Sequence, residues 1–586
     1  MKRLGTISSV TVVLCMTTAA YPAIWYVNAA ATGTQDGSNW HNAFLNPQPA
    51  LAATAPGDEI WVAAGVYTPG PPGDAVSSFV MHEGVALYGG FAGTETARDQ
   101  RNWITHATIL SGDVGHDDIY GNPWYVGWNI VTANSGHVVV GSGVGPTAVL
   151  DGFIVQAGAT GPAGTPAGDP LGYGGGLYVI GGSPTIRNCI FTRNLAAFAS
   201  GGAIYCQDAS PTIAHCRFVQ NYVHLGNGAG IAIVGSAIPS ISDCDFVENH
   251  AVADSGNTGQ GSGISINFLT APLSALIEHC RFEYNVARTF FSAGGIEIAR
   301  GAGISNFGAT LTVRDCIFHH NSANAGAGIQ SWDPITVVNS LFYANTVYSH
   351  DFGAGSDGGY GAGICIYSFQ PDVATVVNCT IANNSGGEGV GMQSLGNAAM
   401  LVFNSIIWGN VATGEDVAPR DAGIRGSYDA EYACIQDLLT PVPGEDPPDP
   451  ENYPGCIVAN PQLISAADYH LGANSPCIDA GRNSSVPTAL TTDLDGRVRF
   501  FDDPATPDTG QGVAPIVDMG AYEFALVVAG DIDCDGDCDL QDALALTAVL
   551  LGQDDAACHV AAADMNDDGA EDGLDVQGFV DALLIP

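Results

Sequence analysis

The chain has 586 residues and a formal net charge of −44 at pH 7, although only 13% of its residues are charged. This charge excludes nucleic acids and anionic membranes as partners that are attracted by charge. Lys2 is the only lysine, so arginine supplies almost all of the strong positive charge, and we expect the chain to repel polyanionic polymers such as pectate.

The first 20 residues have the pattern of a secretion signal. They begin with Met1-Lys2-Arg3, continue with a short apolar run and end in small residues, which predicts cleavage after Ala20. No later run of about 18 apolar residues occurs, so we expect no transmembrane span. The pattern predicts a secreted protein that is extracellular or lies on the outer cell surface.

Residues 21–172 are predicted to form an N-terminal cap and the first coils of a stack. Apolar runs such as Trp25-Tyr26-Val27 indicate strands, and residues 43–54 indicate a short helix that covers the open end of the stack. The GHDD sequence at 115–118 could bind a cation, although we favour a solvated loop.

A repeated pattern occupies residues 173–438. Its first half is rich in glycine and ends in an aliphatic residue, as in GGAIY from Gly201, and its second half has the form of FTRN or FVQN. Successive repeats lie 24 to 39 residues apart, which is typical of a solenoid. The final asparagines are Asn194, Asn221, Asn249, Asn285, Asn321, Asn345, Asn384 and Asn410.

The second half of each repeat requires a bend. An aliphatic residue such as Ile213 and the aromatic residue five positions later, here Phe218, are both apolar, although strict strand alternation would place them on opposite faces. The residue before the intervening Cys or Ser is Asn, Asp or His, and these types tolerate a left-handed backbone. We predict a bend there and a second corner at the final Asn, with stacked amides bonded along the column.

Short strands joined by corners predict an all-β solenoid, a parallel β-helix in which each coil stacks like residue on like residue about 4.8 Å from the next. The cysteines that precede the aromatic position would then form one column with Cβ atoms too far apart to favour disulfides. We predict that they are small buried wall residues. They are Cys189, Cys216, Cys244, Cys280, Cys316 and Cys379.

The combination of GGAI (201–204) with the FxxN repeats resembles the repeats of polymorphic outer-membrane proteins and similar adhesins. It also resembles the wider pectate-lyase-like superfamily, which implies a right-handed parallel β-helix. Such folds serve lyases, hydrolases, adhesins and inert scaffolds, so the resemblance indicates the fold and leaves the function open.

Residues 439–455 are acidic and rich in proline, and we expect an excursion without a core. After them, SPCIDAG (475–481), DLDGRVR (493–499) and VDMGAYEF (517–524) resemble the choice-of-anchor domain that follows exported β-helices. We expect residues 456–525 to form a β-rich cap on the last coils. Outward positions of those coils become apolar, at Val338, Leu341, Val377, Phe403 and Ile406, which indicates a covering segment in preference to a binding patch.

Residues 530–586 contain two twelve-residue patterns that match calcium loops, each with glycine at position 6 and Asp at position 12. The predicted ligands of two Ca²⁺ ions, some through water or a backbone carbonyl, are Asp531, Asp533, Asp535, Asp537, Asp539 and Asp542 in the first loop, and Asp564, Asn566, Asp568, Ala570, Asp572 and Asp575 in the second. An amphipathic helix follows each loop, with Leu544 and Leu584 expected on the apolar faces. The arrangement resembles a type I dockerin, which implies a small α-helical domain and a cohesin-like protein partner.

Catalytic candidates come from the corner before the cysteine column and its neighbours. They are His215, Asp243, Asp245, His279 and Asp315. We favour bend residues over catalytic ones, since their types suit the backbone there. The sequence lacks the NTD, DD, GHG and RIK set of β-helical pectin hydrolases. Two hypotheses remain: a non-catalytic, adhesin-like scaffold that binds a glycan or another cell-surface ligand, which we prefer, and a polysaccharide hydrolase or lyase tethered through its dockerin-like tail.

Overall fold

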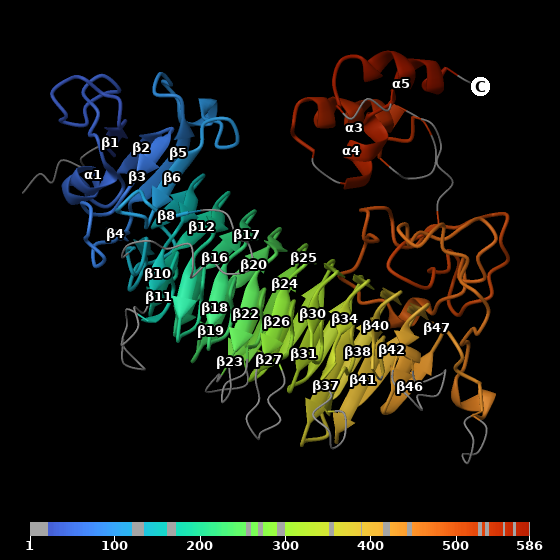
Figure 1. The fold of residues 1–586 in the computed structure, drawn as a ribbon. Helices are drawn as coiled ribbons and strands as arrows, with labels where there is room; N and C mark the ends of the chain where they lie inside the picture. Colours follow the sequence, from blue (N-terminus) through green and yellow to red (C-terminus); the bar gives the residue numbers. More distant parts are fainter. Residues whose placement is uncertain are drawn as a thin grey trace, which may run out of the picture.

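The computed structural model describes residues 22–119, 134–160, 172–253, 259–267, 273–289, 299–350, 357–387, 389–413, 422–441, 448–524, 530–533, 538, 540–554, 557–566 and 570–584. The expected secretion signal lies outside these residues. Four parallel sheets, named A to D below, run the length of a rod that extends from β1 to β47 (Figure 1). The fold is therefore a parallel β-helix solenoid, as the repeat predicts.

The strands of each sheet are stacked in chain order, because successive coils add one strand each to the sheets; sheet D begins only at β10 and ends at β44. Sheet A consists of β1 (Ile24–Val27), β2 (Glu59–Ala63), β5 (Ala86–Phe91), β8 (Val149–Asp151), β12 (Thr185–Arg187), β16 (Thr212–Ala214), β20 (Ser240–Ser242), β24 (Leu273–Glu278), β28 (Ala309–Arg314), β32 (Ile335–Val338), β38 (Val373–Val377), β42 (Ala399–Phe403) and β46 (Ser427–Glu431). Sheet B consists of β3 (Gly65–Tyr67), β6 (Thr108–Ser111), β9 (Ile154–Gln156), β13 (Ile190–Thr192), β17 (Arg217–Val219), β21 (Asp245–Val247), β25 (Arg281–Glu283), β29 (Ile317–His319), β33 (Leu341–Tyr343), β39 (Thr380–Ala382), β43 (Ile406–Trp408) and β47 (Cys434–Ile435).

Sheet C consists of β4 (Phe79–Val80), β7 (Val139–Val140), β11 (Leu177–Ile180), β15 (Ile204–Gln207), β19 (Ile231–Val234), β23 (Ile264–Asn267), β27 (Ile304–Phe307), β31 (Ile329–Ser331), β37 (Ile364–Ser368), β41 (Met392–Gly396) and β45 (Ile424–Arg425). Sheet D consists of β10 (Ala159–Thr160), β14 (Leu195–Ala197), β18 (Tyr222–His224), β22 (His250–Ala253), β26 (Val286–Thr289), β30 (Ser322–Ala323), β34 (Thr346–Val347), β40 (Ser385–Gly386) and β44 (Val411–Ala412). A short antiparallel pair, β35 (Ser349–His350) and β36 (Asp357–Gly358), leaves the rod.

The bend between sheets A and B is where the sequence predicts it. All eight residues before the Cys or Ser column have φ between 47° and 53°, the left-handed region that Asn, Asp and His tolerate. They are Asn188, His215, Asp243, His279, Asp315, Asn339, Asn378 and Asn404.

The second corner differs in one detail from the prediction. Its left-handed residue is the one before the repeated Asn, for example Gln220 with φ of 56°. The Asn supplies hydrogen bonds instead: Asn221 Nδ2 donates to Asn249 Oδ1 at 3.0 Å and to the Phe191 carbonyl at 2.9 Å. The same amide bonds connect every neighbouring pair from Asn194 to Asn410 at 2.9–3.0 Å, so the predicted ladder is confirmed.

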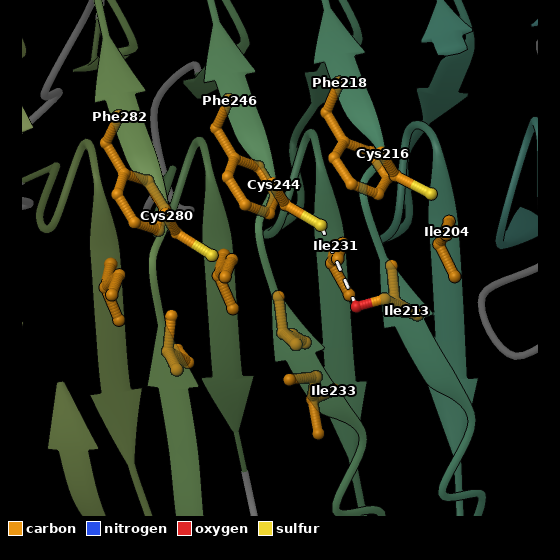
Figure 2. Packing of buried hydrophobic residues seen from close by; sticks show 14 of the residues in the cluster. Ile204, Ile213, Cys216, Phe218, Ile231, Ile233, Cys244, Phe246, Cys280 and Phe282 are labelled. Atoms are coloured by element: carbon orange, nitrogen blue, oxygen red, sulfur yellow. Dashed lines mark hydrogen bonds between the residues drawn. The ribbon is translucent and has the colours of Figure 1, made fainter. Parts of the chain in front are cut away.

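Parallel files of side chains fill the core between the sheets (Figure 2). Six phenylalanines from Phe191 to Phe342 stack with ring centroids 4.5–5.3 Å apart. The column cysteines are free and buried, and each thiol donates to the carbonyl two residues earlier at 3.0–3.2 Å. The prediction of unpaired wall cysteines is confirmed.

The N-terminal end of the rod is covered by α1 (Pro47–Ala53), within the range predicted for a helix. The Asn46 side chain accepts a hydrogen bond from the Gln48 amide at 2.9 Å and so caps the helix N-terminus. Ala50 and Leu51 are buried against the first coils. A 3₁₀ turn at Arg98–Gln100 follows β5.

Residues 456–524 cover the apolar outward positions of the last coils. Val338 packs against Val486, Leu490 and Val517, and Leu341 packs in a cluster with Tyr469 and Tyr522. We call this segment the cap. The expected β-rich structure is wrong for it: in this part of the chain the structure has isolated bridges, such as Leu463 with Leu471, and a 3₁₀ turn at Asn483–Ser485, but no regular strand. Side chains that accept bonds from the backbone replace the strand ladder, as described below.

The C-terminal segment is helical, with α3 (Leu540–Leu550), α4 (Ala557–Ala563) and α5 (Asp575–Leu583). The helices after both loops are as predicted, while α4 between them was not expected. Leu546, Val549 and Phe579 are buried, but Leu544 and Leu584 are 73% exposed, so their assignment to the apolar faces is wrong. Among the described residues, no helix is both long and apolar enough to cross a membrane.

Candidate functional site

A groove of about 720 Å³ lies on the rod at the corner between sheets A and B. All five catalytic candidates of the sequence analysis line it, because their columns stack coil over coil. The groove is lined by His215, Cys216, Arg217, Asp243, Asp245, His279, Cys280, Arg281, Asp315, Ile317 and the cap residues 492–496. It carries five carboxylates, from Asp243, Asp245, Asp315, Asp493 and Asp495, against two guanidinium groups.

Asp245 connects the two arginines of the groove. Its Oδ2 lies 3.2 Å from Arg217 Nε, and its Oδ1 lies 3.2 Å from Arg281 Nε. The register of sheet B places these three residues opposite one another on β17, β21 and β25. The two cations are thereby held on either side of one carboxylate, in a half-exposed row that faces the solvent.

Of the three groove carboxylates that the coils contribute, that of Asp315 is the most enclosed. Its Oδ1 accepts a hydrogen bond from Asn339 Nδ2 at 2.6 Å, and its Oδ2 lies 3.4 Å from His279 Nε2 and 3.2 Å from Arg314 Nε. Burial raises the pKa of Asp315 above its ordinary value, against the opposing effects of Asn339 and His279. A carboxyl group of this kind can hold a proton more readily than an exposed one.

The overhanging wall of the groove, residues 492–496, was not foreseen. The buried Asp493 shapes it: Oδ1 accepts from the amides of Asp495 at 3.0 Å and Arg497 at 2.8 Å, and Oδ2 accepts from the Glu523 amide at 2.9 Å. Asn339 Nδ2 donates to the Thr492 carbonyl at 3.3 Å and joins this wall to the rod. The DLDG sequence indicates a tight turn, but nothing in it shows which coils the turn faces.

Behind the wall, buried charged side chains hold the cap together. The fully buried Arg499 lies 3.3 Å from Glu523 Oε1 and also donates to the Gly520 carbonyl. Asp518 accepts hydrogen bonds from the amides of Asp479 and Phe524, both at 2.6 Å. Burial raises the pKa of Asp518 to about 8. The acidic residues of DLDGRVR and VDMGAYEF therefore organise the cap from within.

His470 supports the same wall. Its Nδ1 lies 2.5 Å from Asp468 Oδ1, its Nε2 lies 2.6 Å from Asp495 Oδ2, and its ring centroid lies 4.1 Å from that of Tyr522, with the two rings tilted by 34°. Burial favours the neutral ring, but the bonds to Asp495 and Asp468 outweigh it and raise the pKa of His470. When the ring is protonated, it pairs with Asp495 and holds this residue in the wall.

Aromatic side chains extend the sheet B face beside the groove. Tyr284, at the end of β25, stacks on His320 at 4.7 Å between ring centroids and is 45% exposed. Next to them, His319 stacks on Tyr343 at 4.8 Å, and Tyr343 contacts Tyr469 of the cap. Flat rings next to hydrogen-bonding groups are common in sites for small polar ligands.

The two predicted calcium loops share one local geometry. Asp542 Oδ1 accepts hydrogen bonds from the amides of Ile532 at 2.5 Å and Asp533 at 2.9 Å, and Asp575 accepts from the amides of Asn566 at 3.2 Å and Asp572 at 2.8 Å. The carboxyl groups of Asp531, Asp533 and Asp542 offer ligand atoms within 4.8 Å of one another. Position 12 of each loop thus bonds to backbone amides of its own loop. Asp535, Asp537, Asp539 and Asp568 lie outside the described residues; Asp564 and Ala570 lie within them.

The GHDD sequence is part of another acidic cluster. The amides of Asp117 and Asp118 point to Asp113, at 3.2 and 3.4 Å from its two carboxyl oxygens, and the three side chains offer ligand atoms within 4.8 Å. Asn134 Nδ2 donates to Asp118 Oδ2 at 2.8 Å. Hydrogen bonds within the cluster account for this arrangement without a bound ion.

Comparisons with known proteins agree with the fold. The family model described as right handed beta helix region matches residues 171–347. Among solved structures, the chain is similar to the pectate lyase Pel9A, with 16% identity, coverage of 86% of this chain and 97% of that one, and a TM-score of 0.37. It is also similar to a rhamnogalacturonan lyase, with 10% identity, coverage of 70% and 87%, and a TM-score of 0.25.

A third similar structure is the GH136 lacto-N-biosidase from Eubacterium ramulus, with 10% identity, coverage of 69% of this chain and 66% of that one, and a TM-score of 0.23. Similarity at this level carries no argument about activity. No curated protein matches the chain. The parallel sheets and the family model together define the class of the protein as a right-handed β-helix protein.

Proposed function

We propose that this protein is an exported scaffold that binds a neutral carbohydrate chain in the groove between sheet B and the cap. The observation that carries the proposal is the groove itself, where carboxylates, imidazoles and guanidinium groups from successive coils face the wall 492–496. These groups offer donors and acceptors at the spacing of the coils, about 4.8 Å, along an extended ligand. The exposed ring of Tyr284 offers an apolar face beside them.

The negative charge of the groove and of the whole chain favours a neutral ligand over an anionic one. The groove holds five carboxylates and two arginines, both of which already face Asp245, and the whole chain has a net charge of −44. A uronate polymer would bring further negative charge into this field, whereas a neutral glycan would not. Neutral polysaccharides are therefore the favoured ligands over pectate.

A glycan array with the full chain tests this proposal. We expect binding to neutral glycans, and a loss of about tenfold in affinity for Asp243→Ala and for Tyr284→Ala. Arg98→Ala, which removes an exposed ion pair with Glu59 far from the groove in sequence, is the matched control and should bind normally. Binding that is unchanged in both groove variants, or binding of polyuronates alone, would contradict the proposal.

A second candidate function is hydrolysis, because the pKa of Asp315 is raised within the groove. Asp243 lies two coils away in the same column, a backbone separation of about 9–10 Å, close to that of the two carboxyl groups in inverting glycosidases. Asp315 would protonate the leaving oxygen and Asp243 would activate water. Release of reducing ends that disappears in both Asp315→Asn and Asp243→Asn would establish this function; binding without release would reject it.

The C-terminal segment supports a separate role, binding of two Ca²⁺ ions and docking to a cohesin-like protein. The support is the closure of Asp542 and Asp575 onto their loops. Calorimetry on chelator-treated protein should show two ions fewer in the double variant Asp542→Ala/Asp575→Ala than in the parent chain. An unchanged number of bound ions would refute the role of these loops.

A further inference from the structure

The cap contains an acidic cluster that the groove and the C-terminal loops do not use. Asp479 lies in the turn that follows Cys477, and Asp502 and Asp508 lie in the loop 502–510, which returns to this turn. The three carboxyl groups offer oxygen atoms that all lie within 4.8 Å of one another. Asp502 and Asp508 are exposed, while Asp479 is fully buried.

Asp479 is unlike the other buried acids of the cap. Both of its carboxyl oxygens are buried, and neither makes a hydrogen bond of good geometry with the described residues, although the Asp503 amide lies near enough to lower the pKa of the group. A buried carboxyl group without partners is costly and rare in folded proteins. Burial, together with the charges of Asp502, Asp508 and Asp503, raises the pKa of Asp479 to about 7, against a smaller opposing effect of the Asp503 amide.

The backbone fixes the position of this carboxyl group. The Asp479 amide donates to Asp518 Oδ1 at 2.6 Å, and its carbonyl accepts from the amides of Thr509 at 2.9 Å and Gly510 at 3.0 Å. Its φ of 48° is left-handed. These bonds connect the turn to the loop 502–510 and hold the Asp479 side chain toward Asp502 and Asp508.

Asp503, the acid next to Asp502, does not belong to this cluster. Its Oδ1 accepts from the Ala505 amide at 3.1 Å and its Oδ2 accepts from Thr506 Oγ1 at 2.7 Å, so its own turn satisfies it. The neighbouring Asp502 and Asp508 instead lie beside Asp479. Asp479 is the buried member of the cluster, and carboxyl oxygens of Asp502 and Asp508 lie within 4.8 Å of its own.

We propose that Asp479, Asp502 and Asp508 bind a Ca²⁺ ion that ties the loop 502–510 to the turn at Asp479. The donors are all carboxylate oxygens, which suit hard cations. Calcium–oxygen distances of about 2.3–2.6 Å place ligands up to about 5 Å apart across the ion, whereas magnesium at about 2.1 Å requires a tighter octahedron. The ion would supply the partner that the buried Asp479 lacks and neutralise the repulsion within the cluster.

The experiment counts calcium ions in the full chain after chelator treatment, by equilibrium dialysis at millimolar Ca²⁺, the range of extracellular sites. The background is the Asp542→Ala/Asp575→Ala variant, which isolates the cap from the C-terminal loops. We expect one ion in this background, no ion there after addition of Asp502→Asn and Asp508→Asn, and a calcium-dependent rise in melting temperature that disappears with them. Asp479→Asn should act in the same way.

Glu451→Gln, an exposed acid of the 3₁₀ turn at Pro450–Asn452, is the matched control and should keep the ion. Because Asp502 and Asp508 are exposed, their variants should fold even if Asp479→Asn does not. Absence of a bound ion in the background variant, or an ion retained after both exposed substitutions, would overturn the proposal. Calcium binding by the C-terminal loops is measured separately, as the two ions that the Asp542→Ala/Asp575→Ala variant loses relative to the parent chain.

Discussion

The coils of residues 172–438 and the cap of residues 456–524 bury polar groups in opposite ways. In the coils, one interaction is repeated: each Asn amide bonds to the next, and each thiol bonds to a nearby carbonyl. In the cap, most buried polar groups have partners of their own, such as Arg499 with Glu523 or Asp493 with three amides, and the carboxyl group of Asp479 is an exception. Repetition distributes stability among equivalent units, whereas a unique network concentrates it in single residues.

The largest expected effect is therefore in the cap. Arg499→Ala leaves Glu523 and the carbonyl of Gly520 without their buried partner, and we expect a loss of about 3–5 kcal/mol from the stability of the cap. Increased binding of a hydrophobic dye and faster proteolysis within residues 456–524 would report it, because the apolar outward positions become exposed. Arg98→Ala removes a half-exposed ion pair with Glu59 and the contacts of Arg98 with Tyr88, and should cost less, about 1 kcal/mol. If the two variants lost the same stability, the proposed concentration of stability in single residues of the cap would be wrong.

Within the coils, the phenylalanine stack should give the largest loss. Phe282→Ala removes a ring between Phe246 and Phe318, and we expect about 3–5 kcal/mol from the cavity and the lost contacts. Phe282→Ile should cost less, since Ile381 and Ile407 occupy the same column further along. Denaturant unfolding followed by tryptophan fluorescence measures both. If Phe282→Ile lost as much unfolding free energy as Phe282→Ala, the idea that equivalent apolar residues stack on one another in this column would be contradicted.

The asparagine ladder should show a moderate effect. Asn285→Ala orphans the Phe246 carbonyl and breaks the bonds to Asn249 and Asn321, and we expect a total loss of about 1–3 kcal/mol, because the neighbouring amides can bond elsewhere along the ladder. Asn397→Ala, at an exposed turn where the side chain bonds only to the Phe369 carbonyl, is the control. Thermal melting should separate the two variants clearly. If the two variants have the same melting temperature, the asparagine ladder contributes little to the stability of the rod.

The smallest expected effect is a pH dependence in the cap. The folded-state pKa of His470 is raised, so its stabilising contribution is complete below its unfolded pKa of about 6.5 and is lost as the pH rises through the higher folded value. We expect a loss on the order of 1 kcal/mol as the pH rises above about 6.5. His470→Gln should flatten this part of the profile of stability against pH. A steeper profile in the variant would show that other groups dominate this range.

The difference between the repeated coils and the cap also explains which features could be predicted from the sequence. The bend residues, the Asn ladder and the unpaired cysteines follow from the sequence, because a solenoid places equivalent residues in files and eight repeats reveal each file. The cap occurs once, so no column reveals its partners. Its motifs suggested strands, yet DLDGRVR and VDMGAYEF form a buried network without regular strands.

The groove is another site whose complete lining could not be predicted from the sequence. Its floor, from His215 to Asp315, was identified as the strongest place for chemistry, but its wall comes from residues more than 170 positions later in the chain. The helix α4 and the exposure of Leu544 were likewise missed, since a short helix and a small domain depend on local packing more than on periodicity.

The sequence by itself determined the coil: its strands, its corners and the files that fill its core, because neighbouring coils impose the same geometry on the same residue types. Only the tertiary structure decided where the cap returns to the rod, which carboxylates face one another in the groove, and that Asp479 meets Asp502 and Asp508. Those contacts join single segments that are distant in the chain, and no repetition records them in the sequence.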